Sequence, residues 1–171
     1  MSIISIIPPT KVELHNLKEG LARYPPPDME EGYLFGFPIP HSYLDQLGER
    51  LFATPKRQLT KKEKDDLAGI QWHMCYNHLL DIAYKRWPRV PDESDVPGHL
   101  KNQEYAGSNG CVTVSPVGDN LDEIFLILAE SSIPELLRMP PLKAIEEIWI
   151  DLREDGCLTR PKWVKTWEYA R

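Results

Sequence analysis

Three polar side chains carry groups that bind metal ions or move protons, and their spacing places them on one side of a helix. His73, Asn77 and Asp81 are four residues apart, so an α-helix brings them into one line. His78, three residues before Asp81, can share that side. Because imidazole, amide and carboxylate groups ligate divalent ions and exchange protons, this stripe predicts a metal or acid–base site.

The same stripe also fits a solvated or hydrogen-bonded face of a core helix. The sequence contains no H-E-x-x-H or E-x-x-H pattern, and asparagine is a weak metal ligand. An enzyme would therefore need another residue that folding brings to the stripe. His41 follows an expected strand and His99 lies in a long loop, and both are candidates for that role. The cofactor of such an enzyme would be a divalent metal ion that polarises a substrate or activates water.

Two further sets of residues are typical of binding. Trp163 and Trp167 lie among lysines near the end of the chain, where aromatic rings can stack on a ligand or dock on a partner. Lys101 and Glu104 lie in the same loop as His99. The alternative for the tryptophans is that a terminal strand or helix uses them to cover the core.

The polar stripe depends on a long helix over about 60–87. Thr60 and Glu63 form a capping box at its start, and Pro88 pushes the preceding residue out of helical geometry at its end. Apolar residues recur at helical spacing on two adjacent faces, which predicts a central and largely buried helix. These residues are Leu67, Ala68, Ile70, Trp72, Met74, Cys75, Leu79 and Ile82.

Strands are expected on both sides of this helix in the sequence. The aromatic segment 33–37 reads as a strand, and Gly36 within it indicates a bulge or the close approach of another backbone. A hairpin is expected over 111–129, with its turn at 118–120. Its second strand is apolar on both faces, which predicts a central or doubly covered position.

Shorter helices and one long loop complete the expected elements. Ser42 and Asp45 indicate a helix that ends before Pro55. The segment from 140 to Gly156 has helical periodicity, although 145–153 also alternates like a strand, and we favour the helix. The remaining expectations are a strand at 3–7, a helix at 11–23 and an irregular loop at about 88–110.

These elements predict an α+β fold, in which a small, mostly antiparallel sheet packs against one long central helix with several shorter helices. The length of 171 residues fits a single globular domain over 1–171 with a proper core.

Composition narrows the classes of function. The chain has 26 acidic and 20 basic residues and a net charge of −6, which argues against a general nucleic-acid-binding protein. Its three cysteines are widely spaced, without a C-x-x-C pair, which argues against a disulfide framework or a zinc knuckle. We expect no signal peptide, transmembrane segment or membrane partner, and a cytoplasmic or nuclear location.

Three functional hypotheses follow from the sequence. The first is a protein-interaction or binding module whose partner is another protein. The second is a small hydrolase or nuclease-like enzyme that uses a divalent metal at the helix stripe. The third is a small-molecule binding domain with a pocket between the sheet and the long helix. The sequence contains no catalytic motif that identifies a reaction, and it leaves the oligomeric state open.

Overall fold

The computed structural model of the chain describes residues 33–87, 112–117, 123–130 and 140–165. In chain order the elements are β1 (Tyr33–Ile39), α2 (His41–Leu51), α3 (Lys61–Arg86), β2 (Thr113–Val117), β3 (Glu123–Glu130), α4 (Leu142–Glu154) and β4 (Lys162–Lys165). The expected strand at 3–7, the helix at 11–23 and the loop at 88–110 lie outside the described residues.

The four strands form one antiparallel sheet in the order β2-β3-β1-β4. The strand pairing of the predicted hairpin is confirmed, because β2 pairs with β3 from Thr113 opposite Ile127 to Val117 opposite Glu123, whereas its expected turn at 118–120 lies outside the described residues. β3 lies between β2 and β1, as its two apolar faces predicted. Phe125, Leu126 and Ile127 are fully buried, so consecutive residues on opposite faces of this strand are removed from water.

Gly36 allows β1 to pair closely with β3. The register between the two strands shifts between Phe35 and Gly36, which is the bulge that the sequence indicated. A Cβ atom at position 36 would lie only 1.8 Å from the carbonyl oxygen of Leu126. Glycine is therefore required here by the neighbouring backbone.

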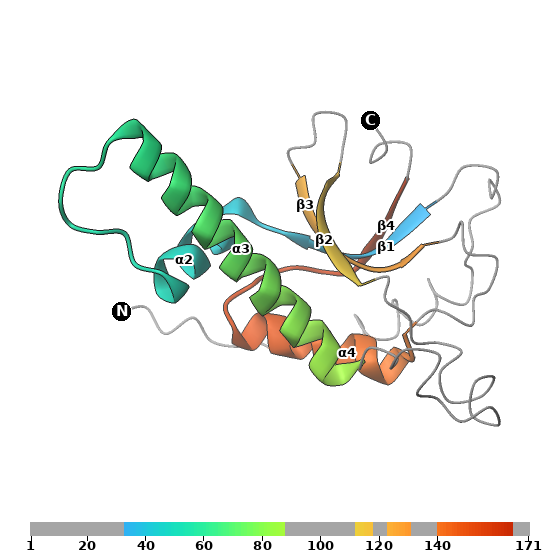
Figure 1. Cartoon of the computed structure of the whole chain (residues 1–171). Helices are drawn as coiled ribbons and strands as arrows, with labels where there is room; N and C mark the ends of the chain where they lie inside the picture. Colours follow the sequence, from blue (N-terminus) through green and yellow to red (C-terminus); the bar gives the residue numbers. More distant parts are fainter. Residues whose placement is uncertain (1–32, 88–111, 118–122, 131–139, 166–171) are drawn as a thin grey trace, which may run out of the picture.

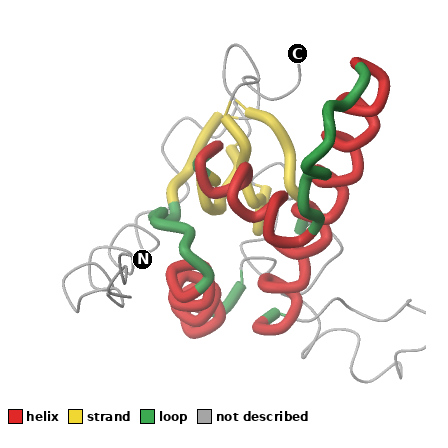
Figure 2. The backbone as a smooth tube through the Cα atoms, turned by 90° about the vertical axis from the view of Figure 1, so that its left-hand side faces the viewer, coloured by secondary structure: helices red, strands yellow, loops and turns green. Residues whose placement is uncertain are grey.

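All three described helices contribute to a core on one face of the sheet. Alternate residues of β1, namely Phe35, Phe37 and Ile39, point into this core together with buried residues of α2, α3 and α4. Figures 1 and 2 show the long helix α3 beside the sheet, with α2 along its first half and α4 near its end. The predicted α+β class is confirmed, with two shorter helices beside the long one in the described part of the chain.

The opposite face of the sheet carries a second, smaller apolar cluster. Leu34, Val117, Phe125 and Ile127 are its buried members, and the partly buried Val164 packs against them. The alternation of these residues with those of the larger core follows from the two-residue period of a strand.

The long helix begins and ends close to where the sequence placed it. Thr60 accepts a hydrogen bond from the backbone of Glu63, and the Glu63 carboxylate accepts one from the backbone of Thr60, so the capping box is confirmed. At its other end, Arg86 forms a two-pronged ion pair with Asp151, with nitrogen–oxygen distances of 2.7 and 3.1 Å. This pair ties the end of α3 to α4.

The expectation that α3 is largely buried is wrong for its first half. Its buried residues, Cys75, Leu79 and Ala83, all belong to the second half. Ile70 and Trp72 are 44% and 38% exposed. The physical reason is that the first half extends away from the sheet and, among the described elements, has only α2 beside it (Figure 1).

The shorter helices differ from the sequence patterns only at their starts. α2 begins at His41 after Pro40, so neither His41 nor Ser42 caps it. α4 spans Leu142–Glu154, which decides the helix–strand ambiguity at 145–153 in favour of the helix. In the part of the chain that the structure describes, none of the helices combines the length and apolar character needed to cross a lipid bilayer.

Candidate functional site

The segment that joins α4 to β4, residues 155–161, is fixed in place from both ends, and we call it the α4–β4 connector. Its glycine, Gly156, has a φ of +96°, in the left-handed region that ends helices. The backbone N–H groups of Gly156 and Cys157 donate to the carbonyl oxygens of Arg153 and Leu152, at 3.0 and 2.8 Å. These bonds satisfy backbone carbonyl groups at the end of α4 and set the direction in which the connector leaves the helix.

Asp155, the first residue of the connector, is held by side chains from two other helices. One oxygen of its carboxylate, Oδ2, accepts hydrogen bonds from the Tyr43 hydroxyl, from Arg50 Nη2 at 2.8 Å and from His78 Nε2 at 3.0 Å. We call these four residues the Asp155 hub. It joins α2, α3 and the end of α4 at one point.

The electrostatics of the Asp155 hub favour a structural role. Burial raises the pKa of the Asp155 carboxyl, but hydrogen bonds from Tyr43, His78 and Arg50 outweigh it and hold that pKa below its ordinary value. Burial and the bond to Asp155 raise the pKa of Tyr43 well above its usual range, so its hydroxyl stays protonated and donates. A carboxylate oxygen with three donors has little capacity left to accept a proton from a substrate.

The residues that follow alternate between the core and the solvent. Cys157 and Thr159 are buried, whereas Leu158 is 61% exposed and Arg160 is also exposed. Burial raises the pKa of the Cys157 thiol to about 12, so this thiol is inert. The Thr159 hydroxyl donates to the carbonyl oxygen of Pro38, which fixes the connector to the end of β1.

Trp149 of α4 contacts the α4–β4 connector and holds it in place. Its indole nitrogen donates to the carbonyl oxygen of Thr159 at 2.7 Å. The guanidinium carbon of Arg153 lies 5.0 Å from the centre of the same indole ring, within the range of a cation–π contact. One buried tryptophan therefore positions both the connector and a cationic side chain.

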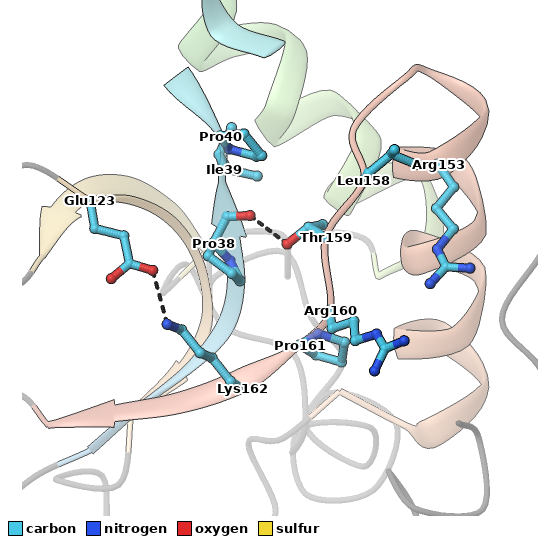
Figure 3. Close-up of a pocket in the computed structure, with 10 residues that line it drawn as sticks. All are labelled: Pro38, Ile39, Pro40, Glu123, Arg153, Leu158, Thr159, Arg160, Pro161 and Lys162. Carbon is cyan, nitrogen blue, oxygen red and sulfur yellow. Dashed lines mark hydrogen bonds and ion pairs between the residues drawn. The ribbon is translucent and has the colours of Figure 1, made fainter. Parts of the chain in front are cut away.

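An open pocket of about 540 Å³ lies between the end of β1 and the α4–β4 connector. This volume is within the range of small-molecule sites. Figure 3 shows the residues around it, which come from β1 and the residue after it, β3, α4, the connector and β4. The lining residues are Pro38, Ile39, Pro40, Glu123, Arg153, Leu158, Thr159, Arg160, Pro161 and Lys162.

The charged groups of the pocket are mostly cationic. Arg153, Arg160 and Lys162 line it together with a single acid, Glu123. The Lys162 ammonium lies 2.9 Å from Oε1 of Glu123. In Figure 3 this ion pair lies on one side of the pocket and the two arginines lie on the other. In an acidic protein, such a concentration of basic side chains around a cavity favours an anionic ligand.

The polar stripe of α3 lies on the surface of the protein. His73, Asn77 and Asp81 are exposed, and the Asn77 amide nitrogen lies 3.1 Å from Nε2 of His73. His78 contacts Asp155, which lies far along the sequence. The stripe residues that hydrogen-bond to each other are therefore His73 and Asn77.

The metal interpretation of the stripe gains no support from the described residues. Within 33–87, 112–117, 123–130 and 140–165, no three histidine, cysteine, aspartate or glutamate side chains are grouped so that they could hold a metal ion. His41 is the exposed first residue of α2. His99, Lys101, Glu104 and Trp167 lie outside the described residues.

Trp163 packs against the core of the sheet, and a role for its ring in ligand stacking stays a prediction. It is partly buried in β4, and its ring centre lies 4.9 Å from that of Phe35 on β1. None of the residues that line the pocket was among the candidate site residues that the sequence indicated. The signal that was available is the alternation of Cys157, Leu158, Thr159 and Arg160 between a glycine and a proline, which is typical of an extended segment with one exposed face.

Comparison of the chain with models of protein families, with curated proteins and with solved structures gave no match.

Proposed function

We propose that this protein is a ligand-binding domain, and that its pocket beside the α4–β4 connector takes a molecule with an anionic group next to an apolar part. The observation that carries the proposal is the fixed connector, which buries Cys157 and Thr159 and thereby presents Leu158 and Arg160 outward. A segment that is ordered before binding pays little conformational entropy when a ligand arrives.

The cationic side chains supply the anion specificity. Hydrogen bonds from guanidinium groups to carboxylates or phosphates are stronger than those between neutral groups, and arginine can form two at once. Arg153 comes from α4 and Arg160 from the connector, so a ligand between them would contact two separate elements.

The apolar part of the ligand would pack on the exposed side chain of Leu158 and on the neighbouring prolines. Leu158 is the most exposed of the large apolar side chains among the described residues. Covering such a side chain contributes roughly 25 cal/mol for each Å² removed from water. This term supports a ligand that combines charge with a hydrocarbon or aromatic group.

The test compares phenylacetate with phenylacetamide, which have the same shape and differ in charge. We expect phenylacetate to shift backbone amide signals of residues 158–160 and 162 in ¹H–¹⁵N NMR spectra, and phenylacetamide to shift them much less. Arg160→Ala should weaken phenylacetate binding roughly tenfold, because it removes a charge-assisted hydrogen bond. Lys143→Ala is the matched control, since it removes an exposed cation from α4 that does not line the pocket.

Two results would contradict the proposal. One is equal binding of phenylacetate and phenylacetamide, which would show that the basic side chains of the pocket do not select for a negative charge. The other is a set of shifts centred on residues that do not line the pocket.

The protein-interaction module expected from the sequence stays a prediction. Ile70 and Trp72, on the half of α3 that extends away from the sheet, are the exposed apolar residues through which such a module would act.

A further inference from the structure

The pocket has two ends of different chemical character. Arg153 and Arg160 lie on the side of α4, whereas Glu123, the first residue of β3, lies on the opposite side (Figure 3). A ligand that contacts only the arginines uses one end. The structure therefore raises the question of what the carboxylate of Glu123 binds at the other end.

The Glu123 carboxylate has capacity for a second cation. The Lys162 ammonium lies 2.9 Å from Oε1, and a carboxylate accepts about four hydrogen bonds through its two oxygens. The side chains of Glu123 and Lys162 are 40% and 47% exposed. Exposed ion pairs of this kind contribute little to stability, so a cation on the ligand can share the carboxylate at small cost.

Three prolines on the pocket wall, Pro38, Pro40 and Pro161, have no backbone N–H with which to bind an anion. The carbonyl oxygens of Pro38 and Pro40 already accept hydrogen bonds from the Thr159 hydroxyl and from the backbone N–H of Leu44. The charged side chains at the two ends therefore supply the polar contacts for a ligand.

We infer, on the basis of the proposed function, that the ligand is zwitterionic: its carboxylate binds between Arg153 and Arg160, and its ammonium group binds Glu123. Free amino acids and short peptides with unblocked termini have this chemistry. An aromatic or aliphatic side chain between the termini would cover Leu158.

The test uses one tripeptide, Gly-Phe-Gly, in three forms, with binding measured by isothermal titration calorimetry. The first form is unblocked, the second is N-acetylated and the third is a C-terminal amide. We expect the unblocked form to bind best, and each blocked form to bind about tenfold more weakly, because each lacks one charge-assisted contact.

Glu123→Gln separates the two ends of the pocket. It keeps the shape of the side chain and removes its charge, so unblocked and N-acetylated peptides should bind this variant equally. The affinity for the N-acetylated form should stay within about twofold of its wild-type value or rise, because the arginine end is intact. Glu146→Gln, at a half-buried position of α4 that does not line the pocket, should leave the preference for the free amino group unchanged.

The outcomes distinguish this inference from the proposed function. If the N-acetylated peptide binds wild-type protein as well as the unblocked one does, the zwitterion inference is overturned and anion binding stands. If neither peptide with a free carboxylate binds, and phenylacetate also fails, the proposed function is overturned together with the inference.

Discussion

Asp155 is the residue on which the arrangement of the helices depends, because one of its oxygens accepts hydrogen bonds from α2 and from α3. We expect Asp155→Ala to lower the free energy of unfolding by about 2–3 kcal/mol, since Tyr43, His78 and Arg50 each lose a charged acceptor. Urea unfolding followed by circular dichroism measures this change. Asp81→Ala, an exposed aspartate on α3, is the control and should change it by no more than about 0.5 kcal/mol.

The same carboxylate gives a prediction about pH. The pKa of Asp155 is lower in the folded protein than in the unfolded chain, where it is about 3.9. Its ionised form therefore stabilises the fold above that pH, and this stabilisation is lost as the pH falls through the folded-state pKa. The difference in unfolding free energy between wild type and Asp155→Asn should shrink as the pH falls below about 4.

Urea titrations at a series of pH values measure this difference. A difference that persists unchanged to pH 2 would contradict the ionic role of Asp155. Contributions from other acids, such as Glu63 beside Arg57, are common to both proteins and cancel in the comparison.

At the scale of elements, we expect the substitution of glycine by alanine to have opposite effects on stability at two positions. Gly36→Ala should destabilise the protein by about 2–3 kcal/mol, because the new methyl group meets the Leu126 carbonyl of the paired strand. Gly69→Ala should stabilise it by about 0.5–1 kcal/mol, since the site lies within α3 and has no atom within 4 Å of the added carbon. Thermal unfolding of the two variants tests both predictions, and a shift of the same sign in both would contradict the argument.

The elements were largely predictable from sequence because their signals are local. The capping box at Thr60, the bulge at Gly36 and the helical stop at Gly156 each depend on a few neighbouring residues, and all three are confirmed. The prediction that the first half of α3 is buried was wrong, because burial depends on which element packs against a helix. An apolar pattern in one segment does not contain that information.

At the scale of the whole molecule, the candidate site was not predictable from sequence. His78 lies on α3 and Asp155 lies 77 residues later in the α4–β4 connector, and the pocket combines the ends of three strands with α4 and the same connector. Each of these juxtapositions depends on how elements far apart in the sequence pack together. The histidine stripe drew attention because its spacing is local, whereas the arginines of the pocket follow no spacing rule.

The order of the strands also determines when the sheet can form during synthesis. β1 lies between β3 and β4, and its residues pair with positions far later in the chain, with Ile39 opposite Ile124 and Tyr33 opposite Lys165. A ribosome adds about 5–20 residues per second, so β1 emerges several seconds before its neighbours exist. Until then its apolar residues are open to chaperones or to other nascent chains. Correct folding of this protein therefore depends on how β1 is protected before β3 and β4 leave the ribosome.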